Sequence, residues 1–269
     1  MFVTDTLLNR LKRGCETMAW PKGPAPALPE RHGGALQLDS GKCTDDCAAC
    51  VALCPTEAIT HSVGMPVELD LGRCVFCGAC VEGCPSRAIT HSGDHRMAVR
   101  RREDLLLGGT DLEQIRLAAA LDTQLRRLFG RSLRLRQVSA GGCAACEADT
   151  NVLGTIGWDL GRFGIQFVAS PRHADGLLVT GPVTQAMVLA LRKTYDAVAD
   201  PKIVIAVGAC AISGGPFAGH AQVKDGAASL LPVDLYIPGC PPHPLTILDG
   251  LLRLLGRLEN ERILPAPNR

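Results

Sequence analysis

Nine residues occur almost identically twice in this chain, as CPTEAITHS at 54–62 and as CPSRAITHS at 84–92. Each copy follows three further cysteines, so the strongest constraint on the fold is a duplicated unit of four cysteines that ends in a Cys-Pro step. A repeat usually reports one structural unit used more than once. It predicts two similar cysteine-rich halves in one small domain. The cysteines are Cys43, Cys47, Cys50 and Cys54 in the first unit and Cys74, Cys77, Cys80 and Cys84 in the second.

The spacing of the second unit, C-x2-C-x2-C-x3-C-P, is typical of a [4Fe–4S] binding run, and the first unit differs by one inserted residue at Thr44–Asp46. Proline after the last cysteine turns the chain away, and in two-cluster ferredoxins that cysteine ligates the other cluster. Zinc sites and incidental thiols are the alternatives. We predict one cluster on Cys43, Cys47, Cys50 and Cys84, and another on Cys74, Cys77, Cys80 and Cys54.

Composition narrows the class of protein. The chain has 269 residues, of which 46% are hydrophobic and 20% charged, with a net charge of +1 and only 4% aromatic residues, which gives no case for nucleic-acid binding. No Gly-rich phosphate loop follows a strand, so no nucleotide site is expected. The N-terminus lacks the features of a signal peptide, and no apolar run approaches the length of a membrane span. We expect a cytoplasmic protein and interpret its high count of thirteen cysteines as a sign of metal binding.

The chain divides into four predicted segments. They are an N-terminal helix with a Pro-rich arm (1–35), a two-cluster domain (36–95), a linker with an amphipathic helix at 112–129 (96–131) and an α/β domain (132–269). We expect the first helix to pack on a neighbouring subunit and the arginines of the linker to form a solvated face.

Three further residues, Cys15, His61 and His91, are interpreted as residues that do not bind metal. Cys15 is expected to be an ordinary thiol in the N-terminal helix. His61 and His91 stand at matching places in the repeat and could tune the clusters, but nothing local marks them as ligands.

Strands and helices alternate from residue 133 onward, which predicts a doubly wound parallel α/β sheet. The predicted strands are 133–139, 164–170, 176–181, 202–208 and 233–239, and helices are predicted over 182–199, beginning at Pro182, and over 242–258.

Four cysteines follow three of these strands. Cys143 and Cys146 (GGCAACE) follow the first, Cys210 (GACAISGG) the fourth and Cys240 (PGCPP) the fifth. The carboxyl ends of parallel strands lie along one edge of a sheet, so these thiolates can meet at one point. Scattered core cysteines are the alternative. We predict a third metal site at this edge.

Residues 131–258 resemble the small-subunit family shared by [NiFe] hydrogenases and the 20 kDa (PSST-type) subunit of complex I. The resemblance lies in GRSLRLRQVSAGGCAACE, RFGIQFVASPRHADGLLVTGPVT, DPKIVIAVGACAISGG and IPGCPPHPLTILDGLL. Residues 1–95 resemble the two-cluster ferredoxin subunit of the same complexes. The chain thus looks like a fusion of an α+β two-cluster ferredoxin domain with a flavodoxin-like α/β domain.

This resemblance implies a third [4Fe–4S] cluster on Cys143, Cys146, Cys210 and Cys240, facing a catalytic large subunit, with Arg172 beside it. The C-x2-C spacing at Cys143 is similar to that of membrane-bound, energy-converting hydrogenases related to formate hydrogenlyase. The expected function is electron relay between an external donor, of ferredoxin or formate dehydrogenase type, and that large subunit. The expected location is the inner face of the cell membrane, reached through partner subunits.

Two rival functions remain at this point. One is a complex I-like quinone or ferredoxin oxidoreductase whose large subunit lacks nickel. The other is a diffusible ferredoxin-type carrier, in which the second half of the chain would have no role.

Overall fold

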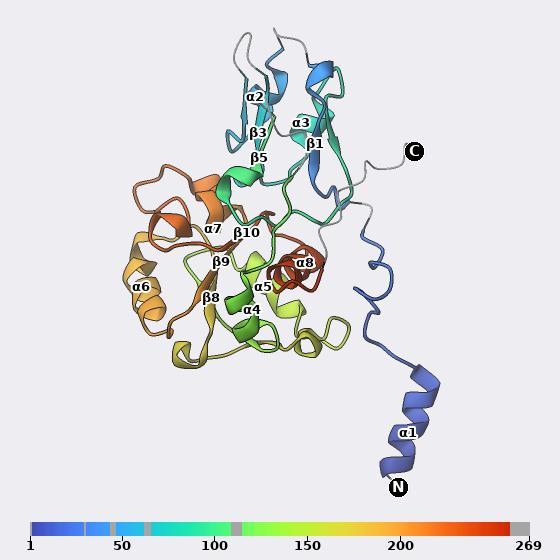
Figure 1. The fold of residues 1–269 in the computed structure, drawn as a ribbon. Coiled ribbons are helices and arrows are strands. Elements are labelled where there is room, and N and C mark those ends of the chain that lie inside the picture. The colour runs from blue at the N-terminus through green and yellow to red at the C-terminus, as the bar shows by residue number, and fades with distance from the viewer. Residues whose placement is uncertain (1, 30, 44–46, 62–65, 109–114, 259–269) are drawn as a thin grey trace.

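The computed structural model describes residues 2–29, 31–43, 47–61, 66–108 and 115–258 (Figure 1). A small cysteine-rich part lies on top of a larger α/β part in this view, and an N-terminal helix projects away from both. Among the described helices, none has the length and apolar character needed to cross a membrane.

The cysteine-rich part is built from two interlocked halves. In each half a short helix with the third cysteine leads through the Cys-Pro step into a strand. The strand before the first unit (β1) pairs with the strand after the second (β4), and β2 pairs with β3, all antiparallel, so the strands of each half pair with those of the other. The elements are β1 (Leu36–Leu38), η1 (Ser40–Lys42), α2 (Ala49–Leu53), β2 (Ile59–Thr60), β3 (Glu68–Asp70), α3 (Ala79–Glu82), β4 (Ile89–His91), η2 (Arg102–Leu105) and β5 (Leu106–Gly108).

Five parallel strands form the sheet of the larger part, in the order β10-β9-β8-β6-β7. Renumbered within the domain this is 5-4-3-1-2, the flavodoxin-like order, which confirms the predicted fold class. The strands are β6 (Leu133–Ser139), β7 (Ile165–Phe167), β8 (Gly176–Thr180), β9 (Ile203–Val207) and β10 (Leu235–Ile237), and each lies within a predicted strand.

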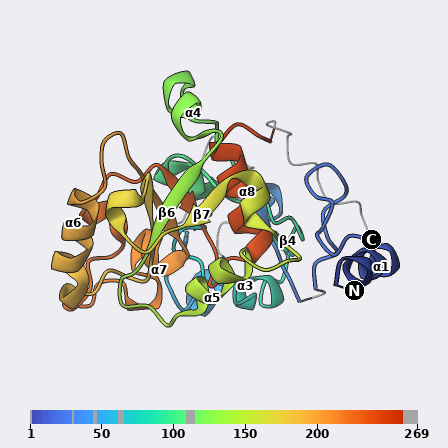
Figure 2. The ribbon, with the colours of Figure 1, turned by 90° about the horizontal axis from the view of Figure 1, so that it is seen from below.

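Helices cover both faces of this sheet (Figures 1 and 2). The helical elements are α4 (Thr123–Phe129), α5 (Ala145–Val152), η3 (Leu160–Phe163), η4 (Pro171–His173), η5 (Gln185–Met187), α6 (Val188–Asp196), α7 (Ala209–Ser213), η6 (Gly215–Phe217), η7 (Ala227–Ser229) and α8 (Pro244–Leu254). Every residue of α8 is buried.

Alternating strand residues feed two apolar cores, as the twofold period of a strand requires. Ile203, Ile205 and Val207 pack with α8, whereas Val204 and Ala206 pack into a second core. That second core runs without interruption into the cysteine-rich part. The two parts of the chain therefore share one interior on this side of the sheet.

Two predicted helices are shorter than their sequence patterns suggested. The helix expected over 112–129 is α4 alone, because Asp122 caps it by accepting hydrogen bonds from the amides of Gln124 and Leu125. Residues 112–114 of the expected helix lie outside the described residues. Upstream, Ala118 and Leu121 are buried and their amides bond to other segments.

The helix expected from Pro182 begins only at Val188, preceded by η5. The intervening Val183 has a φ of 58°, which interrupts any helix there.

The N-terminal helix α1 (Phe2–Arg13) ends before Cys15, so the expectation that Cys15 lies in this helix is wrong. Cys15 is exposed, and its thiol points to the carbonyl of Thr17 at 3.8 Å. The arm behind it is fixed by Arg162, which donates to the carbonyls of Met18 and Trp20. Packing of α1 on a neighbouring subunit stays a prediction, as do the four segment boundaries.

Candidate functional site

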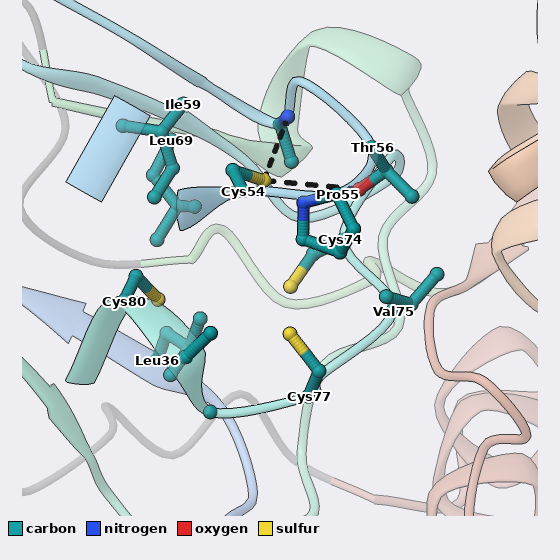
Figure 3. Close-up of a pocket in the computed structure, with 13 residues that line it drawn as sticks. Leu36, Cys54, Pro55, Thr56, Ile59, Leu69, Cys74, Val75, Cys77 and Cys80 are labelled. Atoms are coloured by element: carbon teal, nitrogen blue, oxygen red, sulfur yellow. Dashed lines mark hydrogen bonds between the residues drawn. The ribbon is translucent and has the colours of Figure 1, made fainter. Parts of the chain in front are cut away.

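The first cysteine group lines a cavity in the cysteine-rich part. Figure 3 shows the thiols of Cys74, Cys77 and Cys80 turned toward a common space, with Cys54 from the other repeat at its edge. Leu36, Ile59 and Leu69 supply apolar walls. The structure therefore brings together four cysteines that the crossed pairing predicts.

A second cavity is lined by the complementary set. Three of its cysteines, Cys43, Cys47 and Cys50, come from the first repeat, and Cys84 comes from the second. In both cavities the fourth cysteine crosses from the opposite half.

Backbone amides approach the crossing cysteines in the same way in both repeats. Ala58 donates to Sγ of Cys54 at 3.2 Å, and Ala88 donates to Sγ of Cys84 at 3.2 Å. Donors of this kind stabilise a thiolate, and hydrogen bonds to sulfur tune the potential of a bound cluster. Nothing in the side-chain identities of these two alanines announces this role, which depends only on their backbone.

The third group lies at the carboxyl ends of the strands of the larger part. Cys143 precedes α5 and Cys146 lies in it, directly after β6, whereas Cys210 lies in α7 after β9 and Cys240 follows β10. Burial chiefly raises the pKa of Cys146, and the neighbouring Glu147 and the other three cysteines of the group add to the rise. Burial also raises the pKa of Cys210, with Cys240 and Cys143 adding to it, so all four cysteines lie in one neighbourhood. Cys143 and Cys240 are exposed, so this group opens to the surface.

Glycines allow the backbone to pass close to two of these thiols. A Cβ on Gly208, whose φ is 90°, would lie 2.5 Å from Sγ of Cys146. A Cβ on Gly215 would lie 2.9 Å from Sγ of Cys210. Only glycine fits such close approaches at positive φ.

The state of the cysteine thiols is compatible with metal binding. The thirteen cysteines, all within the described residues, form no disulfide. Burial raises the pKa of Cys74 and of Cys146 to about 12, so without a bound cation these thiols stay protonated at neutral pH. A bound metal cation would supply the positive charge that holds thiolates in such surroundings.

A single zinc ion is the alternative to a cluster in these groups. A structural zinc site needs four ligands about 2.0–2.3 Å from one point, and within the described ranges no three His, Cys, Asp or Glu side chains are placed to hold one metal ion together. Each cavity of the cysteine-rich part is lined by four cysteines, the number of thiolates that a [4Fe–4S] cluster takes as ligands.

Other singled-out residues occupy different positions. Arg172 is exposed in η4, and in the described part of the chain no hydrogen bond or ion pair ties it to the four cysteines of the third group. Its predicted place beside a cluster stays a prediction. His61 donates from Nδ1 to the carbonyl of Cys47 at 2.8 Å, and His91 lies in β4, where burial lowers its pKa.

Glu147 lies next to Cys146 of the third group, and its hydrogen-bond partner was not predicted from the sequence. It accepts a hydrogen bond from Oγ1 of Thr180 at 2.6 Å, which joins α5 to the end of β8. Thr180 is completely buried. The bond spans the point where the chain switches from one side of the sheet to the other, between β6 and β8.

Fold and site together define an iron–sulfur protein in which a dicluster domain is fused to a flavodoxin-like domain with its own cysteine group. Comparison with known proteins agrees. Residues 42–89 match the family "4Fe-4S dicluster domain", and residues 143–254 match "NADH ubiquinone oxidoreductase, 20 Kd subunit".

The chain is 42% identical over 164 residues to an NADH-quinone oxidoreductase subunit of Phocaeicola vulgatus, covering 60% of this chain and 79% of that protein. It is 42% identical over 135 residues to a probable membrane-bound hydrogenase subunit, mbhJ, of Pyrococcus furiosus, covering 50% and 81%. A chain of the archaeal membrane-bound sulfane sulfur reductase is 33% identical, covering 51% and 75%, with a TM-score of 0.44. This chain belongs to the same family as the NADH-quinone oxidoreductase subunit of Phocaeicola vulgatus.

Proposed function

We propose that this chain is an electron-relay subunit whose twelve grouped cysteines hold three [4Fe–4S] clusters. When bound, such clusters accept and release single electrons. The observation that carries the proposal is the sorting of the cysteines into three groups of four, two of which line separate cavities with the fourth cysteine drawn from the opposite repeat. The assigned ligands are those predicted above: Cys43, Cys47, Cys50 and Cys84; Cys74, Cys77, Cys80 and Cys54; and Cys143, Cys146, Cys210 and Cys240.

The third group is the proposed exit toward a catalytic partner. Cys143 and Cys240 are exposed, and a cluster open to water would lose electrons to side reactions, so a partner surface has to cover it. In the dicluster part Cys50, Cys74 and Cys80 are buried, whereas Cys77 is exposed. The third group, with two exposed cysteines and none that is buried, is the most open of the three, which supports a fixed subunit over a diffusible carrier.

We propose that the partner is the large subunit of a membrane-associated [NiFe] hydrogenase-like complex, which this chain joins on the inner face of the membrane. The C-x2-C spacing of Cys143 and Cys146 supports this choice, and one relative is named as a membrane-bound hydrogenase subunit. A complex I-like assembly without nickel is the second candidate, because the other relative is named as a quinone oxidoreductase subunit.

The test is purification of the intact complex under anaerobic conditions through a tag on this chain. We expect a large subunit with nickel to copurify and the complex to evolve hydrogen from a low-potential donor. A copurifying large subunit without nickel, in a complex that reduces quinone, would replace the hydrogenase assignment by the second candidate. A chain that purifies alone and exchanges electrons freely would favour the carrier.

A further inference from the structure

A side-chain hydroxyl links the two parts of the molecule between two of the cysteine groups. Ser213, the last residue of α7, donates from Oγ to the carbonyl of Gly72 at 2.9 Å, and its other acceptor, the carbonyl of Ala209, lies in its own helix at 3.1 Å. Gly72 is buried and belongs to the cysteine-rich part, 141 residues away in the chain.

Both ends of this bond are close to cysteines along the chain. Gly72 stands two residues before Cys74, and Ser213 stands three residues after Cys210 in the same short helix. A path from Cys74 to Cys210 therefore follows covalent bonds except at one step, the hydrogen bond between Ser213 and Gly72. In Figure 3, chain from the C-terminal part runs beside Val75, next to the same cavity.

The loop that offers the Gly72 carbonyl is held rigidly. Asp70 accepts from the Gly72 amide at 2.8 Å through one carboxylate oxygen and from Arg102 at 2.6 Å through the other. Its backbone carbonyl also accepts from the amide of Cys74 at 3.1 Å. Because these bonds hold the Gly72 carbonyl in place, the hydrogen bond from Ser213 fixes the distance between the two parts of the molecule at this point.

Other contacts keep the two parts together without Ser213. Val99 and Tyr236 exchange two backbone hydrogen bonds, of 3.0 and 2.9 Å, and Arg100 donates to the carbonyl of Asp234 at 2.7 Å. The apolar core is also continuous across the boundary. Removal of the hydroxyl should therefore loosen one junction and leave the assembly of the two parts in place.

We propose that Ser213 is a positioning residue that sets the gap between the cysteine group of Cys74 and that of Cys210, and that electrons cross between the two parts at this junction. The inference rests on the proposed relay function. Electron tunnelling slows exponentially with distance and is faster along bonds and hydrogen bonds than through space. A longer or fluctuating gap at this point therefore slows the transfer without removing any ligand.

The test compares Ser213→Ala with the parent in the intact purified complex. Hydrogen exchange should become faster at the amides of residues 70–74, because their anchor is lost. Rapid-freeze electron paramagnetic resonance after dithionite addition should show the third cluster reduced several-fold more slowly, with unchanged iron content and unchanged reduction of the other two. Ser229→Ala is the matched control, since that hydroxyl bonds only locally to the carbonyl of Gly226, and it should change neither readout.

Ser213→Thr, which keeps the donor, should restore both the exchange and the rate. Parental exchange and a parental rate in Ser213→Ala would overturn the proposal, and so would a threonine variant as slow as the alanine variant. If the alanine variant loses iron, the exchange measurement on residues 70–74 in the threonine variant decides, and fast exchange there contradicts the role of the hydroxyl. A parent complex whose third cluster is absent would refute the relay function itself, and the exchange data would still test the bond.

Discussion

The two parts of this molecule build cysteine sites in opposite ways. In the dicluster part, three cysteines of each group come from one short loop and the fourth from the matching repeat, all within residues 43–84. In the α/β part, the four cysteines come from three strand ends spread over residues 143–240. The first kind of site is encoded by local spacing, and the second exists only because the parallel sheet aligns the ends of its strands.

The two kinds of site also meet their surroundings differently. The dicluster groups offer backbone donors to sulfur, as at Ala58 and Ala88, and are lined by apolar side chains. The third group relies on missing side chains at Gly208 and Gly215, which let the backbone approach its thiols. A repeated loop supplies backbone amide donors to its own cysteines. A site between strand ends instead needs glycines that leave space for the thiols.

The largest effect is expected from Cys210→Ser in the third group. Turnover at the partner subunit should fall by orders of magnitude, while dithionite still reduces the dicluster part, whose eight cysteines are untouched. Turnover and cluster spectra are measured on the same assembled complex, because loss of a ligand can also destabilise the fold. Cys15→Ser, a change at an exposed thiol outside all three groups, is the control. Parental turnover in an assembled complex without the third cluster would sink the relay assignment.

The next effect tests the crossing of ligands in the dicluster part. Cys54→Ser should chiefly alter the spectrum of the cluster assigned to Cys74, Cys77 and Cys80, and Cys84→Ser should alter the other one, because each cysteine lines the cavity of the opposite repeat. Electron paramagnetic resonance of the two variants distinguishes these patterns. The reverse assignment, with each variant affecting its own repeat, would show that the pairing is local.

A moderate effect is expected from Gly208→Ala at the edge of the sheet. The new Cβ would lie 2.5 Å from Sγ of Cys146 at a φ of 90°, so both the fold and the third cluster should suffer, with a loss of about 2–4 kcal/mol in the free energy of unfolding. Gly219→Ala is the matched control, because Gly219 has a φ of 77° and nothing within 4 Å of the added Cβ. Equal iron loss in both variants would show that backbone strain alone is responsible.

The smallest effect concerns a polar cluster around His95. Burial lowers the pKa of His95 to about 4; Asp94 opposes this shift, and Arg96, His32 and Arg253 add to it. The unfolded chain binds this proton near pH 6.5, so the stability contributed by the neutral ring is complete above pH 6.5 and is lost as the pH falls toward 4.

This loss should be about 1–2 kcal/mol between pH 7 and pH 5. His95→Gln should remove that part of the pH dependence, which urea unfolding of parent and variant at both pH values measures. An equally steep fall in the variant would assign the pH dependence to other groups.

The sequence revealed local features and missed those that depend on distant partners. The five strands and the doubly wound α/β class followed from the hydrophobic pattern and are confirmed. The flavodoxin-like assignment came with the family resemblance, and the three cysteine ligand sets stay predictions. The length of α4 did not, because the residues before it, including Ala118 and Leu121, bond to segments far away in the chain. The Ser213 bond to Gly72 was equally invisible, since neither residue type is unusual in its own segment.

The central claim, three groups of four cysteines with one cluster in each, is tested most directly by counting iron and acid-labile sulfide. Protein purified without oxygen should contain about twelve of each per chain, and Cys210→Ser should contain about eight, with the dicluster signals retained. A reproducible value of about eight in the parent, with an intact C-terminal domain, would contradict the third group as a cluster site.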